Sequence, residues 1–139
     1  MGDSGSGMTA KLVNNLLAHV NATVIIEGFA LATKYGLDPK QLYEVIQNSS
    51  GNSQVLKRFE SYIMSGSFKP GMSFELFYKD SLLVCELGRE LGVPMFVSNI
   101  AHAVYEWGRT SGLKKENWGM LITLWENLLK VQIGEKEKG

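Results

Sequence analysis

The stretch from Met8 to Tyr35 constrains the fold most, because it runs for 28 residues without a proline. Its apolar residues recur on more than one face of a helix, and its single glycine, Gly28, lies well inside it. A helix that is apolar nearly all round is buried on most sides. We therefore predict a long first helix that runs through a core or a subunit interface and ends at Gly36, a left-handed cap.

Capping residues divide the rest of the chain into shorter helices. Asp38, Ser53 and Ser73 each stand immediately before a periodic apolar segment and are predicted helix N-caps. Strand signals are weak throughout, so the predicted fold class is all-α, a multi-helix domain with a long buried first helix. The expected segments are a short helix after Pro39, a helix carrying residues 55–63, a loop over 66–71, and helices over 74–91, 94–111 and 115–131.

Composition narrows the possible functions. The chain has 139 residues, 45% of them hydrophobic and 20% charged, which is ordinary usage for one globular domain. Its formal net charge of zero predicts neither nucleic-acid binding nor attraction to an anionic membrane. The single cysteine, Cys85, cannot form an intramolecular disulfide and is predicted to be a core residue. No secretory signal pattern is present, and the expected location is cytoplasmic.

A glycine-rich segment, Gly2-Asp3-Ser4-Gly5-Ser6-Gly7, stands directly before the long helix. Glycines let a backbone approach a ligand closely, and a helix N-terminus favours anions. No strand precedes the segment, so it does not meet the requirements of a dinucleotide-binding turn. The alternative is a flexible lead-in or a cloning remnant.

Lys11 and Asn15 follow this segment, and their spacing of four residues places them on one face of the helix. A lysine can act as a general acid or base when burial lowers its pKa, and an adjacent amide can hold a hydroxyl or carbonyl oxygen. The alternative is a solvated polar stripe. His19 and His102 have no further ligand residues at metal-binding spacing, so we predict packed or surface histidines and no metal site.

The glycine-rich segment, Lys11 and Asn15 form one block, Gly2-x-x-Gly5-x-Gly7-x-x-x-Lys11-x-x-Asn14-Asn15. Four later blocks are Glu27-x-x-Ala30-Leu31-Ala32-x-x-x-Gly36-Leu37-Asp38, Ser50-Gly51, Leu76-x-x-Lys79-Asp80 and Gly92-Val93-Pro94. Together, these blocks resemble the β-hydroxyacid dehydrogenase family, which includes 3-hydroxyisobutyrate dehydrogenase and tartronate semialdehyde reductase, and the first block is the most specific. The resemblance extends to about Leu129 and implies a fold like the helical C-terminal domain of 6-phosphogluconate dehydrogenase, with a long first helix that contributes to a homodimer.

The resemblance also implies residue roles. Lys11 would be the catalytic lysine that moves a proton on or off the substrate hydroxyl, and Asn15 would hold the substrate beside it. Ser4 and Gly5 would line the substrate cleft between two domains. Lys79 would face the nicotinamide end of the cofactor.

Asp80 would be more structural. Apart from the resemblance, the adjacent opposite charges of Lys79 and Asp80 indicate a solvated face. One departure accompanies these roles. Met72 stands where the family often has Phe, and Phe74 is the neighbouring replacement.

The larger departure concerns the N-terminal Rossmann domain of this family, because the chain contains no glycine-rich turn after a strand. We therefore expect an excised C-terminal domain, with an interdomain lead-in over residues 1–7, a substrate and dimerisation domain over 8–131, and a charged tail over 132–139. The intact enzyme would use NAD or NADP to interconvert a small β-hydroxyacid and its semialdehyde or keto form. The chain alone would bind no cofactor and be inactive.

Two alternatives remain open. One is a stand-alone helical dimerisation module, which would keep the dimer but need no particular residue at Lys11 or Asn15. The other is a distant member of the wider 6-phosphogluconate-dehydrogenase-like group that uses another substrate.

Overall fold

The computed structural model describes residues 4–65 and 73–135, and within them every regular element is a helix. One antiparallel bridge joins Ser73 and Asn117 and is the only strand-like pairing in these two ranges. The predicted all-α class is confirmed. The elements are α1 Ser4–Tyr35, α2 Pro39–Gln47, α3 Gln54–Phe59, a π-helical turn η1 Glu60–Met64, α4 Phe74–Leu91, α5 Phe96–Thr110, two 3-10 turns η2 Leu113–Lys115 and η3 Trp118–Leu121, and α6 Ile122–Leu129.

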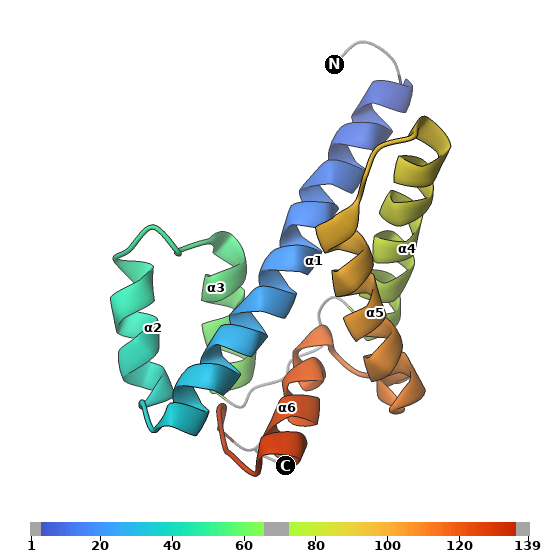
Figure 1. Cartoon of the computed structure of the whole chain (residues 1–139). Helices are drawn as coiled ribbons and strands as arrows, with labels where there is room; N and C mark the ends of the chain where they lie inside the picture. The colour runs from blue at the N-terminus through green and yellow to red at the C-terminus, as the bar shows by residue number, and fades with distance from the viewer. Residues whose placement is uncertain (1–3, 66–72, 136–139) are drawn as a thin grey trace.

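Helix α1 runs the length of the molecule, and each of the other α-helices packs against it (Figure 1). α4 and α5 form a helical hairpin beside its N-terminal half. α2 and α3 lie beside its C-terminal half on the other side, and α6 lies below the α4–α5 hairpin. α1 is therefore the element that joins the two parts of the fold.

The predicted helix caps are confirmed. Asp38, Ser53 and Ser73 each accept a hydrogen bond through a side-chain oxygen from the backbone N–H three residues later, at 3.0, 3.1 and 3.2 Å. These bonds satisfy N–H groups that have no partner within the helix. The glycines predicted to end α1, α4 and α5 all have positive φ: Gly36, Gly92 and Gly112.

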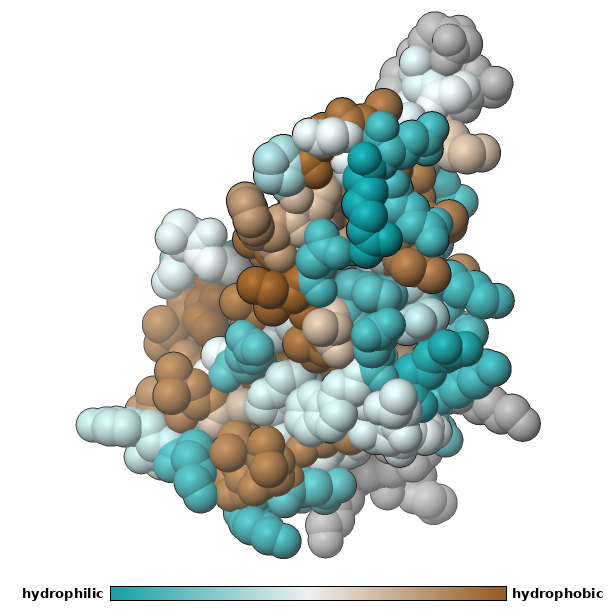
Figure 2. Space-filling view, turned by 45° about the vertical axis from the view of Figure 1, so that its right-hand side comes forward, coloured by the Kyte–Doolittle hydropathy of each residue, from teal (hydrophilic) through white to brown (hydrophobic). Residues whose placement is uncertain are grey.

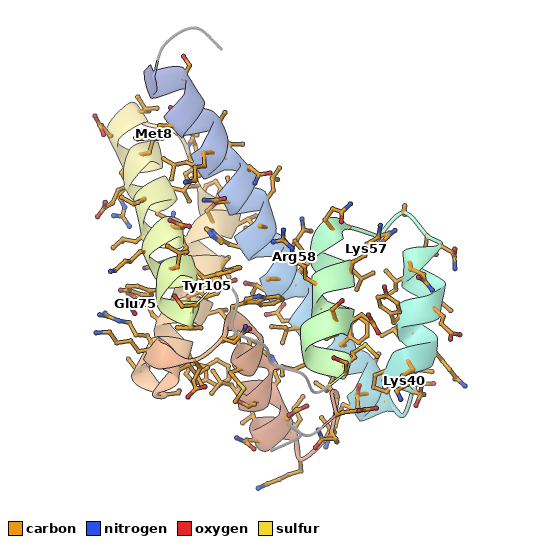
Figure 3. All side chains as sticks on the ribbon, turned by 180° about the vertical axis from the view of Figure 1, so that it is seen from behind. Met8, Lys40, Lys57, Arg58, Glu75 and Tyr105 are labelled. Atoms are coloured by element: carbon orange, nitrogen blue, oxygen red, sulfur yellow. The ribbon has the colours of Figure 1, made fainter. Side chains whose placement is uncertain are left out.

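Aromatic contacts connect the helices in the core. Phe29 of α1 packs on Phe59 of α3 with ring centroids 4.6 Å apart. Phe77 of α4 contacts Tyr105 of α5 at 5.9 Å and Trp118 of η3 at 5.5 Å. Figure 3 shows Tyr105 within the part of the molecule built by α4, α5 and α1. All five rings are buried, so they fix the relative positions of these helices.

Within a single chain, α1 is buried on only part of its surface, so the core alone does not give the predicted burial on most sides. Ile26 and Phe29 are buried in the core, but Leu17, Val24 and Leu31 are 59%, 55% and 74% exposed. By length and mean hydropathy α1 could also cross a membrane, a property that core helices of soluble proteins share. The core explains the apolar residues on the buried side of α1, and those on its exposed side need another explanation.

Several predicted boundaries also differ. α1 begins at Ser4, so Gly5 and Gly7 of the predicted lead-in lie in its first turn. The helix predicted over 115–131 is interrupted, because Glu116 and Asn117 have extended backbone dihedral angles. The backbone N–H of Phe74 donates to the Glu116 carbonyl at 2.8 Å and holds this segment against the start of α4. The predicted loop over 66–71, Met72, and residues 1–3 and 136–139 lie outside the described residues.

Candidate functional site

Three polar residues one turn apart form a stripe along the N-terminal half of α1: Lys11, Asn15 and His19 (hereafter the polar stripe). Lys11 is exposed, Asn15 is half-buried and His19 is fully buried. The stripe therefore passes from solvent into the core. The prediction that Lys11 and Asn15 share one helix face is confirmed, since residues at i and i+4 lie above one another.

Helix α4 adds a carboxylate to the polar stripe. Asn15 donates a hydrogen bond from Nδ2 to Oδ2 of Asp80 at 3.3 Å. Partial burial raises the pKa of Asp80, and the positive charge of Lys11 acts in the opposite direction. The structure thus brings Lys11, Asn15 and Asp80 together, although 65 residues separate Asn15 from Asp80.

Asp80 is the residue that sequence reasoning undervalued, because the Lys79-Asp80 pair indicated a solvated face. That interpretation fits Lys79, whose side chain is exposed, but not Asp80, which packs toward α1. Adjacent residues project about 100° apart around a helix. Lys79 therefore points away from the Asn15 contact, and its cofactor role stays a prediction.

The predicted cleft residues lie at the start of α1. Gly5 is exposed in the first turn, six residues before Lys11, which is about 9 Å along the helix axis. The backbone of Ser4 opens the helix, while its side chain lies outside the described part of the chain. Both residues are at the same end of α1 as Lys11, and their substrate role stays a prediction.

The buried end of the polar stripe is anchored by aromatic residues. The His19 ring lies 5.1 Å from the Phe77 ring and 6.1 Å from the Tyr105 ring. The Tyr105 hydroxyl donates to the His19 backbone carbonyl at 3.1 Å, and the Thr23 hydroxyl donates to the same oxygen at 3.0 Å. Burial lowers the pKa of His19 to about 4, so the ring is neutral at physiological pH. Nδ1 of His19 has no hydrogen-bond partner among the described residues.

His102 is also a packed residue. The sequence had left open whether it would be packed or at the surface. Its Nδ1 lies 2.7 Å from the hydroxyl oxygen of Ser81, and its Nε2 lies 3.5 Å from the Glu106 carboxylate. Ser81 also donates to the backbone carbonyl of Tyr78 at 2.8 Å, which leaves its oxygen free to accept from His102. Ser81 is buried, so this group connects α4 with α5 and offers no exposed nucleophile.

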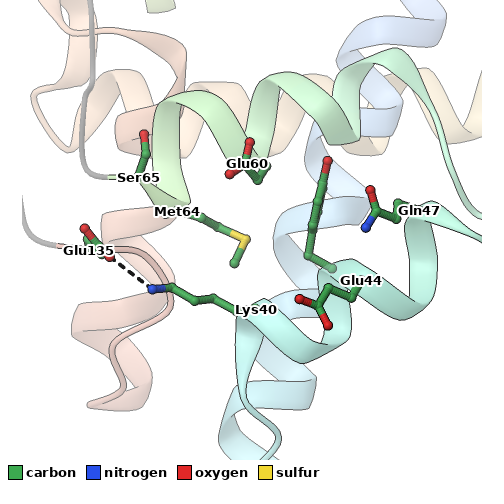
Figure 4. A pocket seen from close by; sticks show the side chains of 8 residues that line it. Lys40, Glu44, Gln47, Glu60, Met64, Ser65 and Glu135 are labelled. Carbon is green, nitrogen blue, oxygen red and sulfur yellow. Dashed lines mark hydrogen bonds and ion pairs between the residues drawn. The ribbon is translucent and has the colours of Figure 1, made fainter.

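A hollow far from Lys11 lies between α2, η1 and the C-terminal segment (Figure 4). Its volume is about 430 Å³, and Lys40 pairs across it with Glu135 at 3.2 Å. Glu44 and Glu60 also line it. No group of three or more potential metal ligands occurs in the described parts of the chain.

Comparison with known proteins assigns the class. Residues 5–125 match the family model described as NAD-binding of NADP-dependent 3-hydroxyisobutyrate dehydrogenase. The match covers most of the chain, so the chain belongs to this family of hydroxyacid dehydrogenases. The matched range includes Lys11, Asn15 and Asp80. The resemblance noted from the sequence blocks is confirmed.

Individual relatives agree with the family. The 2-(hydroxymethyl)glutarate dehydrogenase of Eubacterium barkeri is 37% identical over 134 residues, which are 96% of this chain and 44% of the relative. The L-threonate dehydrogenase of Cupriavidus necator is 31% identical over 124 residues, 89% of this chain and 42% of the relative. The crystal structure of 3-hydroxyisobutyrate dehydrogenase from Salmonella typhimurium superposes with a TM-score of 0.81 at 27% identity, covering 86% of this chain and 42% of that protein. The chain thus spans less than half the length of these proteins.

Proposed function

We propose that the chain is the helical substrate-side domain of an NAD(P)-dependent hydroxyacid dehydrogenase, with Lys11 as the residue that transfers the proton. The observation that carries the proposal is the convergence of Lys11, Asn15 and Asp80 from α1 and α4 within the family-matched range. A cationic group, an amide and a carboxylate at one surface are the groups that a hydroxyl oxygen, its proton and a carboxylate-bearing substrate require. A cytoplasmic location is part of this proposal.

The cofactor, when bound, supplies the hydride chemistry at the substrate carbon. The residues of this chain then manage the oxygen: Lys11 takes or gives the hydroxyl proton, and Asn15 holds the substrate beside it. Lys79 is exposed on α4 and can contact the nicotinamide end of the cofactor. The described residues contain no strand followed by a glycine-rich turn, so the pyrophosphate needs a second, Rossmann-type domain. Ser4 and Gly5, at the start of α1, would then line the cleft between the two domains.

The substrate class follows from what the relatives are named for. 2-(Hydroxymethyl)glutarate and L-threonate both carry a hydroxyl group and a carboxylate, although they differ in size and branching. We propose a small hydroxyacid of this kind. The domain that would provide the second wall of the pocket sets the choice among such acids.

The test is an assay of the chain joined to the segment that precedes it in its gene. A panel of 2-(hydroxymethyl)glutarate, L-threonate and 3-hydroxyisobutyrate is offered with NAD and with NADP. We expect NAD(P)H formation with at least one acid, and no activity from the chain alone. Lys11→Ala should lower kcat by about 10²-fold or more, the low end for general acid–base catalysis.

Lys57→Ala is the matched control, because Lys57 is an exposed lysine on α3, on the other side of α1 from Tyr105 and Glu75 (Figure 3). It should leave kcat unchanged. A Lys11→Ala enzyme that turns over at the full rate contradicts the assigned role of Lys11.

A homodimer is the second part of the proposal. Leu17, Val24 and Leu31 are spaced seven residues apart and are exposed along α1, the spacing of a helix-packing seam. On the face drawn in Figure 2, hydrophobic side chains gather toward the left and hydrophilic ones toward the right. A symmetric pair of chains would bury this seam on both copies.

Light scattering of the purified chain tests the dimer. We expect twice the 15.4 kDa chain mass for the wild type and the single mass for Val24→Glu. Leu128→Glu is the control, because Leu128 is an exposed apolar residue on α6, away from the seam of α1. A monomeric wild type at high concentration contradicts this part of the proposal.

A stand-alone dimerisation module is the second candidate function, and the same exposed seam favours it. The two candidates differ in what they ask of Lys11. A module would keep its dimer and its biological effect in Lys11→Ala, whereas a dehydrogenase domain would keep the dimer and lose catalysis.

A further inference from the structure

The contact between Asn15 and Asp80 determines which end of the Asn15 amide faces solvent. An ionised carboxylate has only acceptor oxygens, so a neighbouring amide must turn its NH₂ group toward it. Partial burial raises the pKa of Asp80, and the positive charge of Lys11 opposes this rise by favouring the ionised form. Nδ2 of Asn15 accordingly donates to Oδ2 of Asp80. Because the amide is planar, its Oδ1 then lies on the side away from Asp80 and is available as an acceptor.

We propose that Asp80 is a positioning residue that holds Asn15 as a hydrogen-bond acceptor, so that the site recognises a substrate hydroxyl by its proton. This inference rests on the proposed function, because it assigns the substrate hydroxyl to the surface formed by Lys11 and Asn15. When the hydroxyacid binds, Oδ1 of Asn15 accepts a hydrogen bond from the hydroxyl group, and Lys11 lies at the hydroxyl oxygen. In the oxidation step the Lys11 amine then takes the proton from that oxygen, and in the reverse reaction the ammonium gives it back.

The arrangement discriminates between the two forms of the substrate. The hydroxyacid offers both an oxygen for Lys11 and a proton for Asn15. The semialdehyde or keto form keeps the oxygen but has no proton, so Oδ1 of Asn15 faces another oxygen without a hydrogen between them. Leaving a polar group without its partner weakens binding. The hydroxyacid is therefore the form whose affinity depends on Asp80.

The first test uses this chain alone and needs neither substrate nor cofactor. In a ¹⁵N-correlated NMR spectrum, the side-chain NH₂ resonances of Asn15 should shift with the titration of the Asp80 carboxyl group, which is followed through its ¹³Cγ resonance. Asn14 is exposed on the adjacent helix position, so its NH₂ resonances serve as an internal control that should not follow Asp80. In Asp80→Asn the pH-dependent shift of Asn15 should disappear. If the Asn15 NH₂ resonances of the wild type do not shift with the Asp80 titration, the proposal is overturned.

The second test separates positioning from a general structural role. In the enzyme that contains its N-terminal domain, Asp80→Asn should raise KM for the hydroxyacid that the panel identifies by about tenfold, the effect of losing one hydrogen bond that a charged group orients. KM for the matching oxo substrate should not rise, because that form has no proton for Oδ1 of Asn15 and loses no hydrogen bond when the amide is free to turn. Asp80→Glu keeps a carboxylate acceptor and should bring KM for the hydroxyacid part of the way back to its wild-type value.

Glu90→Gln is the matched control, because it removes a carboxylate charge from an exposed position on α4. It should leave both KM values unchanged. Equal increases of both KM values in Asp80→Asn would show a loss of structure and overturn the proposal. The NMR result does not depend on turnover, so failure of the proposed function and failure of this inference give different outcomes.

Discussion

Gly108 of α5 is a position where a single methyl group should disturb the packing of α4, the helix that carries Asp80. A Cβ atom at Gly108 would lie 2.5 Å from Cζ and 2.8 Å from Cε2 of Phe74, and 3.1 Å from Cδ1 of Leu121. Phe74 and Leu121 are both 0% exposed, so neither side chain has free space into which to move. Gly108 therefore allows α5 to approach the start of α4, and Gly108→Ala should force the two helices apart.

The magnitude follows from two opposing terms. Overpacking a rigid core costs about 1–3 kcal/mol, and the short distances to Phe74 place Gly108→Ala near the upper end. Replacing glycine by alanine inside a helix stabilises the folded state by about 1 kcal/mol. The expected net loss is about 2 kcal/mol of unfolding free energy. With an unfolding entropy of about 2.1 cal/mol/K per residue over 139 residues, Tm should fall by about 7 °C.

Gly28 provides the matched control within α1. A Cβ atom there would meet no heavy atom within 4 Å. Gly28→Ala should therefore show the helix-propensity gain alone, about 0.5–1 kcal/mol, and raise Tm by about 2–3 °C. Both variants change the unfolded chain in the same way, so the difference between them reports the folded state.

The assay is urea and thermal unfolding followed by circular dichroism, at a concentration low enough to keep the chain monomeric because Gly28 lies beside the exposed seam of α1. A Gly108→Ala protein as stable as the wild type would refute the packing of Phe74 over Gly108. It would also remove the basis for the fixed relation between α4 and α5.

Three further predictions concern the polar stripe and the helix caps. Burial lowers the pKa of His19 to about 4 from its model-peptide value of 6.5, so its contribution to stability is present above pH 6.5 and is lost as pH falls toward 4. In urea titrations the free energy of unfolding of the wild type should fall by about 2 kcal/mol more than that of His19→Phe between pH 7 and 5. Equal decreases in the two proteins would contradict this prediction. Lys11→Met should raise the pKa of Asp80 further, measured from its ¹³Cγ resonance, because the favourable charge is gone; Lys57→Met should not. Ser73→Ala removes the N-cap of α4 and should lower the free energy of unfolding by about 1 kcal/mol in the same unfolding assay. The shift of the Asn15 NH₂ resonances with the Asp80 titration should not change.

The helix starts could be predicted because capping is local. Asp38, Ser53 and Ser73 each bind an amide only three residues away, so the sequence contains both partners of each bond. The break before α6 could not be predicted in this way. It depends on the backbone bond from Phe74 to Glu116, whose partners are 42 residues apart and have no side-chain signature.

The same distinction applies to the site. Lys11 and Asn15 share a face because of their spacing, and continuing that spacing by one turn would have found His19. Asp80 reaches Asn15 only after α4 has packed against α1, so no local pattern reports the contact. The Lys79-Asp80 pair suggested a solvated face because adjacent opposite charges usually lie at a surface.

The gradient of burial along the polar stripe explains how one helix can position a reactive group and still leave it accessible. At the buried end, His19 is held between aromatic rings and its carbonyl accepts two hydroxyl protons, so α1 cannot rotate about its axis without breaking these contacts. Asn15, one turn away, inherits that orientation and is fixed a second time by Asp80. Lys11, a further turn out, keeps its water. The proton transfer proposed for Lys11 would be favoured by exclusion of water, so in the proposed enzyme a wall that covers Lys11 would come from outside this helical fold. The core of this chain thus determines how the polar stripe is oriented, while the proposed reactivity of Lys11 would depend on the surface that closes over it.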